Sequence, residues 1–242
     1  MTGVKDRYKG KLFSVLGDSI STFEGFSEPR DAVFYDTPTK ITSGVVTVGD
    51  TWWGKVVDEL GGEILVNDSF SGSTVCRHPL AEIPSYACGD ERTSSLGREK
   101  VAPDVIIVFM GTNDWGQGFG IRYGDTSGDL ANFYVAYKTT LKKLKKNYPR
   151  AEIWCITLAT RGAKEIYAEL AACRGIKDVA EYSAAIGVCA KEESCRLIDL
   201  SRFDAPYRTI DGLHPDALGM TAIAQAVLFE LNSSDERDFQ GE

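Results

Sequence analysis

Short apolar runs recur along the chain, separated by segments in which apolar residues follow helical spacing. The runs lack the alternation of a half-exposed strand, which indicates strands buried on both faces, at residues 12–16, 64–66, 105–110, 153–158 and 197–200. Among the intervening and following segments we predict helices at residues 52–60, 129–147, 177–193 and 217–231. Buried strands that alternate with helices favour an α/β fold with a parallel sheet covered on both faces.

Three stretches do not follow this rhythm: residues 24–49, 76–97 and 115–128. They are rich in Gly, Pro, Ser, Asp or aromatic residues, and each begins just beyond the carboxyl end of a predicted strand. Because open α/β sheets build their sites at that edge, we predict that these stretches are loops that select the substrate.

The chain has 242 residues, of which 43% are hydrophobic, so it can bury one substantial core. We predict a single domain over residues 1–242, with a core from about residue 11 to residue 232 and polar, flexible ends. The net charge of −8 argues against a general attraction to nucleic acid or to anionic membranes. The sequence leaves the oligomeric state open.

Targeting signals are not evident in this sequence. Residues 1–10 are polar and the first strand follows them directly, so we do not expect a signal peptide. Nor is there a run of about 18 apolar residues that would predict a membrane span. We expect a cytoplasmic protein, or a secreted one if a leader has been removed.

Six cysteines, at positions 76, 88, 155, 173, 189 and 195, form no CxxC pair. Spacing permits disulfides between Cys189 and Cys195 or between Cys76 and Cys88 but establishes neither, and reduced thiols are the expected state. With two histidines, no HExxH motif and no cysteine cluster, the sequence predicts neither a metal site nor a cofactor.

Gly17-Asp18-Ser19 follows the first predicted strand. An ordinary turn with a capping residue would account for these residue types. A serine at the tip of a buried strand is also rigidly held, and its N–H can point at the same atom that its oxygen attacks. Ser19 is therefore a candidate nucleophile.

A serine nucleophile needs a base, and this chain has only His78 and His214. Asp211 precedes His214 by three residues, so the acid can hold one ring nitrogen while the other faces Ser19. The alternative is a histidine in a surface turn that Asp211 caps. His78 has no acid at such spacing, and we interpret it as a loop residue or a substrate contact.

Acyl transfer also needs donors for the oxyanion. Gly72, in the loop after the second strand, allows a backbone N–H to approach a substrate oxygen closely. Asn113, after the third strand, supplies a side-chain amide. Ser-Gly and Asn-Asp are also common turn residues, so neither position is decisive alone.

Taken together, these motifs resemble the SGNH hydrolases, also called the GDSL esterase and lipase family. The resemblance rests on GDSI at 17–20, the segment around Gly72, GTND at 111–114 and DGLHP at 211–215, and it extends from residue 12 to about residue 230. Ile20 stands where the family name has leucine, a conservative change beside the expected nucleophile.

The resemblance implies a three-layer α/β/α sandwich with a central parallel sheet of about five strands in flavodoxin-like order. It also implies Ser19 as the nucleophile, His214 as the base and then the acid, and Asp211 as the residue that orients the imidazole. The Ser19 N–H, the Gly72 N–H and the Asn113 amide would form the oxyanion hole.

For the substrate, aromatic groups mixed with polar ones in the loops suit sugars better than long acyl chains. We predict substrate contacts at Asp18, His78, Trp115, Arg122 and Tyr123. Trp52 and Trp53 open a predicted helix, so we assign them to the core.

The hypothesis is a serine esterase that acts on short-chain carboxylic esters, with acetyl groups on carbohydrate as the expected substrate. Lysophospholipase or thioesterase activity on longer acyl chains is the alternative enzyme. A non-catalytic carbohydrate-binding protein would have no use for a complete set of Ser19, Asp211, His214 and Asn113.

Overall fold

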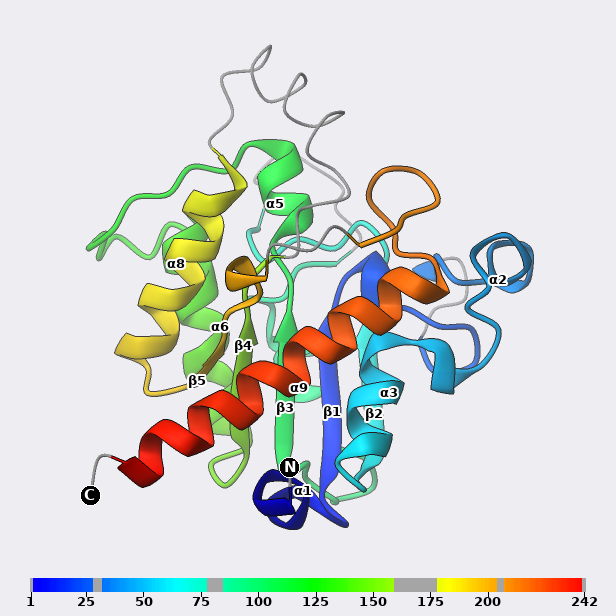
Figure 1. Ribbon diagram of the computed structural model, residues 1–242. Helices are drawn as coiled ribbons and strands as arrows, with labels where there is room; N and C mark the ends of the chain where they lie inside the picture. Colours follow the sequence, from blue (N-terminus) through cyan, green and yellow to red (C-terminus); the bar gives the residue numbers. More distant parts are fainter. Residues whose placement is uncertain (1, 28–31, 78–84, 159–177, 204–206, 241–242) are drawn as a thin grey trace.

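The computed structural model describes residues 2–27, 32–77, 85–158, 178–203 and 207–240 (Figure 1). Within these ranges the chain forms one five-stranded sheet in the order β2-β1-β3-β4-β5, and every pair of neighbours is parallel. The strands are β1 (Leu12–Gly17), β2 (Glu63–Ser69), β3 (Val105–Phe109), β4 (Glu152–Ile156) and β5 (Arg196–Ile198). The predicted flavodoxin-like order is confirmed.

One helix precedes the first strand, and others connect the strands and follow the last of them. They are α1 (Thr2–Tyr8), α2 (Thr37–Ser43), α3 (Trp52–Glu59), α4 (Asp90–Ser94), α5 (Thr112–Gln117), α6 (Phe133–Asn147), α8 (Val179–Glu192) and α9 (Ala217–Gln240). Short 3₁₀ turns lie at η1 (Ser19–Ser21), η3 (Val48–Asp50) and η4 (Leu200–Arg202).

The sheet separates two hydrophobic clusters, as successive side chains of each strand point to opposite faces. Along β3, Val105, Ile107 and Phe109 join the cluster that contains α1, α3 and α9. Ile106 and Val108 join the cluster that contains α6 and α8. Helices therefore cover both faces (Figure 1), and the predicted three-layer α/β/α sandwich is confirmed.

The predicted elements differ from the observed ones mainly at their ends. The helix predicted from residue 129 begins at Phe133, because Asp129 to Asn132 forms a turn in which the Asn132 N–H donates to the Asp129 carbonyl at 3.0 Å. The last helix runs nine residues beyond the predicted 231, to Gln240. The stretches predicted to be irregular contain α2, α4 and the second half of α5, so that description was wrong for these segments.

The amino-terminal segment also differs from the expectation of a polar, flexible end. It forms α1, in which Val4 and Tyr8 are 5% and 2% exposed and pack into the core beside α9. Val4 and Tyr8 are four residues apart, the spacing of one helix face, so a signal for this helix was present in the sequence.

None of the helices in the described ranges is long and apolar enough to cross a bilayer. Five of the cysteines lie in those ranges, at positions 76, 88, 155, 189 and 195, and all five are free thiols. Neither disulfide that the spacing permitted is formed. Cys173 lies outside the described residues.

Candidate active site

The turn that carries Ser19 begins where β1 ends at Gly17. Asp18 caps this turn, and its carboxylate accepts the Ile20 N–H at 3.0 Å. A Cβ at position 17 would lie 2.5 Å from the Ser69 hydroxyl and 2.6 Å from the Ser21 Cβ, so the close packing of β1 against β2 requires glycine here.

Two tryptophans fix the other end of this turn. The Trp52 indole donates to the Ser21 hydroxyl at 3.2 Å, and the Trp53 indole donates to the Ser21 carbonyl at 2.9 Å. Both tryptophans are fully buried. They belong to the core, as the sequence predicted, and they anchor the segment that follows Ser19.

Ser19, His214 and Asp211 lie in a line of hydrogen bonds. The Ser19 Oγ is 2.8 Å from His214 Nε2, and His214 Nδ1 is 2.6 Å from Asp211 Oδ2. Asp211 Oδ1 accepts the backbone N–H groups of Leu213 and His214 at 3.0 Å and 2.8 Å, so the turn itself fixes the carboxylate. Residues 195 positions apart in the sequence thus come within proton-transfer distance.

Electrostatics favour a neutral imidazole at this position. Burial lowers the pKa of His214 below its ordinary value of 6.5, and the Asp211 carboxylate offsets only part of this effect. Burial acts to raise the pKa of Asp211, but the hydrogen bonds from His214 and Leu213 outweigh it and hold that pKa below 3.8. Near pH 7 the charged acid therefore fixes the proton on Nδ1 and leaves Nε2 as an acceptor for the serine proton.

Phe34 covers one face of the imidazole. The two ring centroids are 3.5 Å apart with an interplanar angle of 14°, which is a stacked arrangement. The Phe34 backbone N–H donates to the Thr22 hydroxyl at 2.9 Å, and this bond ties the aromatic residue to the end of the Ser19 turn. Such a contact restricts rotation of the His214 ring and favours its protonated form once the proton has been transferred.

Besides the Ser19 N–H, the two other predicted oxyanion donors come from the loop after β2 and from the first turn of α5. Asn113, near the start of α5, donates through Nδ2 to the Ser73 carbonyl at 2.8 Å, which leaves the second amide hydrogen for another acceptor. Gly72 has φ of +78°, and a Cβ built there would meet nothing within 4 Å. Its backbone conformation explains the glycine, and the space beside it is open.

Two fully buried carboxylates lie beneath these loops. Asp114 accepts the Val75 and Cys76 N–H groups at 2.8 Å each, which fastens the loop after β2, the Gly72 loop, to α5. Burial raises the pKa of Asp18 to about 7, with a contribution from the charge of Asp114, and burial raises the pKa of Asp114 to about 6. Both carboxyl groups therefore hold the backbone around the site in place and do not face solvent.

Four of the five predicted substrate contacts lie in the described residues. Asp18 and Trp115 are 1% and 6% exposed, so their side chains are buried and offer a substrate little surface. Arg122 pairs with Asp125 and Asp129, and Tyr123 packs its ring against Tyr134 of α6. The Arg122 pairs lie within the loop, and the Tyr123 contact holds the loop against α6.

His78 lies outside the described residues. For the other four predicted contacts, a role in substrate binding stays a prediction.

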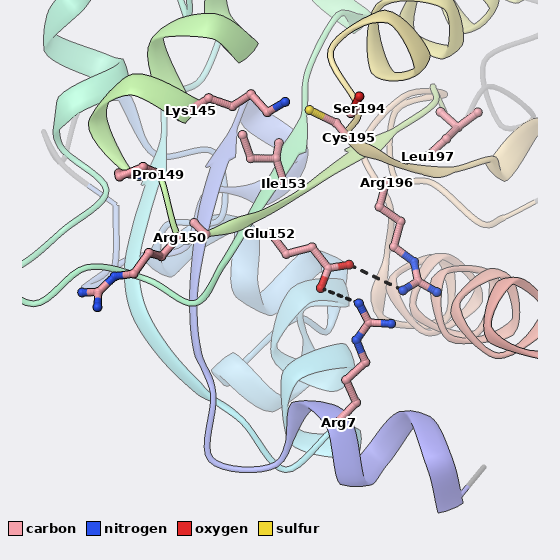
Figure 2. Close-up of a pocket in the computed structure, with 11 residues that line it drawn as sticks. Arg7, Lys145, Pro149, Arg150, Glu152, Ile153, Ser194, Cys195, Arg196 and Leu197 are labelled. Carbon is pink, nitrogen blue, oxygen red and sulfur yellow. Dashed lines mark hydrogen bonds and ion pairs between the residues drawn. The ribbon is translucent and has the colours of Figure 1, made fainter. Parts of the chain in front are cut away.

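A hollow of about 650 Å³ lies at the other end of the sheet (Figure 2). At the amino ends of β4 and β5, Glu152 lies between Arg7 and Arg196, with N–O distances of 3.3 Å and 3.5 Å. The Tyr8 hydroxyl donates to the same carboxylate at 3.0 Å. Because these charges pair with one another and fasten α1 to the sheet, we interpret this cluster as structural.

The sequence did not predict a role for two residues near the site, Phe34 and Arg92. Phe34 belongs to the apolar run Ala32–Tyr35 inside the stretch 24–49, and that run was the only signal for it. Arg92 follows two acidic residues on the short helix α4, and its buried position has no signal in the local pattern.

A parallel sheet between two layers of helices, with hydrogen-bonded Ser, His and Asp residues at its carboxyl edge, defines the class of α/β serine hydrolases. Residues 11–231 match the family model described as GDSL-like lipase/acylhydrolase. The chain belongs to this family and is a carboxylic ester hydrolase, so the resemblance noted in the sequence is confirmed.

Solved structures and a curated protein are also similar. A crystal structure described as a GDSL-like lipase from Bacteroides ovatus ATCC 8483 is 27% identical, with a TM-score of 0.72 over 93% of this chain and 99% of that one. A carbohydrate acetylesterase from Sinorhizobium meliloti is 14% identical, with a TM-score of 0.62 over 92% of this chain and 99% of that one, a likeness of fold alone.

The cellulase/esterase CelE of Acetivibrio thermocellus is 34% identical over 56 residues, which are 23% of this chain and 6% of that protein. The match therefore spans only a small part of the length of that relative.

Proposed function

We propose that this protein removes short acyl groups, in particular acetyl groups on carbohydrate, through a covalent acyl-enzyme on Ser19. The observation that carries the proposal is the line from Ser19 Oγ to His214 Nε2 at 2.8 Å and from His214 Nδ1 to Asp211 at 2.6 Å. A serine hydroxyl becomes a nucleophile when a positioned neutral base can take its proton.

In the proposed reaction, Ser19 Oγ attacks the ester carbonyl while His214 Nε2 takes the hydroxyl proton. The oxyanion accepts hydrogen bonds from the Ser19 and Gly72 N–H groups and from the Asn113 amide. His214 then gives its proton to the leaving alcohol, and the Ser19 ester remains. Water, activated by the same imidazole, releases the acid and restores the serine.

Support for a short acyl group on a sugar comes from the chemistry around the triad. The loops combine aromatic rings, such as Phe34 beside His214, with hydrogen-bonding groups, a combination that suits the apolar faces and polar edges of sugars. The carbohydrate acetylesterase with the same fold is in keeping with this choice.

The test is hydrolysis of p-nitrophenyl esters of increasing acyl length, together with release of acetate from acetylated xylan. We expect the acetyl ester to give the highest kcat/KM and Ser19→Ala to lose activity by several orders of magnitude. A fluorophosphonate should label the wild type and leave Ser19→Ala unlabelled. A kcat/KM that rises steadily with acyl length would instead support lysophospholipase or thioesterase activity.

A further inference from the structure

Arg92 is a buried charge whose two Nη groups donate to the ends of β1 and β2 and to the loop that carries Gly72. It lies on α4 and is 6% exposed. Nη2 donates to the Gly17 carbonyl at 3.1 Å and to the Asp68 carbonyl at 2.6 Å, at the carboxyl ends of β1 and β2. Nε lies 3.0 Å from the Asp68 carboxylate as an ion pair without hydrogen-bond alignment.

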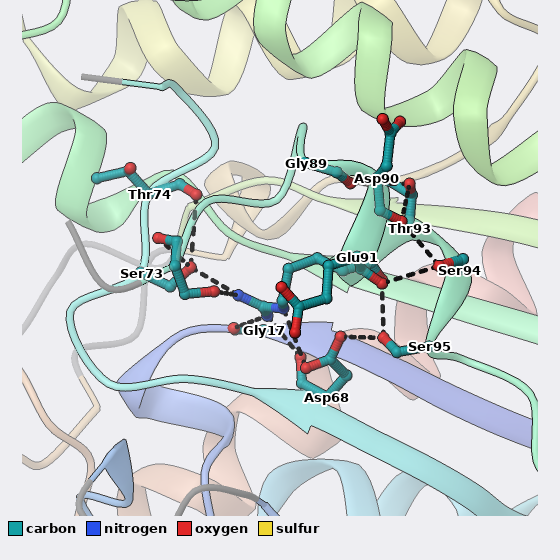
Figure 3. Close-up of polar contacts among 12 residues, drawn as sticks. Gly17, Asp68, Ser73, Thr74, Gly89, Asp90, Glu91, Thr93, Ser94 and Ser95 are labelled. Atoms are coloured by element: carbon teal, nitrogen blue, oxygen red, sulfur yellow. Dashed lines mark hydrogen bonds and ion pairs between the residues drawn. The ribbon is translucent and has the colours of Figure 1, made fainter. Parts of the chain in front are cut away.

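The other side of the guanidinium reaches the loop that carries Gly72. Nη1 donates to the Ser73 hydroxyl at 2.8 Å and to the Ser85 hydroxyl. The Ser73 hydroxyl in turn donates to the Ser85 carbonyl at 3.1 Å. Figure 3 shows Gly17, Asp68 and Ser73 close to one another. Because Arg92 donates to all three, a single planar group joins β1, β2 and the loop that carries Gly72.

Ser73 connects this cluster to the site. It directly follows Gly72, and its carbonyl accepts the Asn113 amide at 2.8 Å. The position of Ser73 therefore sets the direction of the Gly72 peptide and the orientation of the Asn113 side chain. We propose that Arg92 is a positioning residue that acts through Ser73 to align the oxyanion donors Gly72 and Asn113, an inference that rests on the proposed function.

The chemistry of arginine fits this role better than that of another cation. Taking a charged side chain out of water costs several kcal/mol, which its hydrogen bonds and ion pairs must offset. A contact that only joins two strands does not need a charged residue. A planar fork with donors on two sides holds its acceptors in a fixed relative geometry. Lysine keeps the charge, but its three donors lie on one nitrogen, so it cannot reproduce the four bonds that Arg92 makes from two nitrogens.

The experiment is a double-mutant cycle on kcat for p-nitrophenyl acetate, with active sites counted by fluorophosphonate labelling. Ser73→Ala removes one acceptor of Arg92 but leaves Gly17, Asp68 and Ser85 to pair the charge, so the fold should persist. We expect Ser73→Ala and Arg92→Lys each to lower kcat per active site by about 10-fold or more, with KM changed less than about 3-fold.

In an Asn113→Ala background, where the aligned amide is already absent, Ser73→Ala should cost much less than in the wild type. The matched control is Ser95→Ala, which removes a hydroxyl bonded to the outer oxygen of the Asp68 carboxylate and should leave kcat unchanged.

Two results would overturn the inference while leaving the esterase intact. One is an additive cycle, in which Ser73→Ala has the same effect with and without Asn113. The other is a loss that disappears when kcat is expressed per labelled site, because Arg92 would then only stabilise the fold. A wild type that neither hydrolyses esters nor is labelled at Ser19 would overturn the proposed function itself and this inference with it.

Discussion

Replacing Asp211 with asparagine tests the triad through the position of one proton. In the wild type, Asp211 Oδ1 accepts two backbone N–H groups and Oδ2 accepts the Nδ1–H of His214 at 2.6 Å. In Asp211→Asn the amide oxygen must keep the two backbone bonds, so the NH₂ group faces Nδ1. Two donors cannot face each other, so the ring proton moves from Nδ1 to Nε2. Nε2 then donates a hydrogen bond to Ser19 and can no longer accept the serine proton.

The opposite amide orientation would point NH₂ at two backbone N–H groups, at a cost of about 1–3 kcal/mol for each lost bond. The wrong tautomer therefore predominates. For triads of this kind, such a change lowers the rate by about 10³–10⁴-fold, which is about 4–5.5 kcal/mol in the barrier.

The assay is kcat/KM on p-nitrophenyl acetate near pH 7.5, with thermal unfolding as a check of the fold. The matched control is Asp178→Asn, a capping aspartate at the start of α8 whose carboxylate accepts the Ala180 N–H at 3.0 Å. It should retain full activity. If Asp211→Asn retained more than about one-tenth of the wild-type rate, the assignment of Asp211 as the orienting acid would be refuted.

Three further outcomes are expected. Phe34→Leu removes the ring stacked on His214 and should lower kcat by about 2- to 30-fold, whereas an unchanged kcat would show that the stack does not assist the imidazolium. Because burial lowers the pKa of His214, the acid limb of the kcat/KM profile should have its midpoint below pH 6.5, and a midpoint above 7 would contradict this. The pKa of Asp18 rises from 3.8 to about 7 on folding, so its contribution to stability falls as the pH rises from about 4 to about 7. Asp18→Asn keeps the acceptor for Ile20 and should be more stable than the wild type at pH 8, by a few kcal/mol at most, and no more stable near pH 4; urea unfolding at both values measures this.

The sequence determined the order of elements and the chemical identity of the site. The central strands β1, β3 and β4 are buried on both faces and so leave continuous apolar runs. The edge strands β2 and β5 are only partly buried, but short apolar runs still mark them. Parallel strands bring their carboxyl ends to one edge. GDSI begins at the end of β1 and GTND just after the end of β3, whereas DGLHP follows the last strand by a longer loop. Local chemistry within four residues, such as Asp211 beside His214, was also readable, because it needs no distant partner.

The tertiary structure alone decided which distant groups meet. Arg92 contacts Gly17 across 75 residues, and neither position carries a pattern that names the other. Phe34 stacks on His214 for the same reason: both rings are held by elements whose approach depends on the packing of the whole sheet. The packing of Tyr123 against Tyr134 likewise depends on how the loop folds back on α6. Periodicity encodes which face of an element is buried, whereas the partners of a buried group are set by packing in three dimensions.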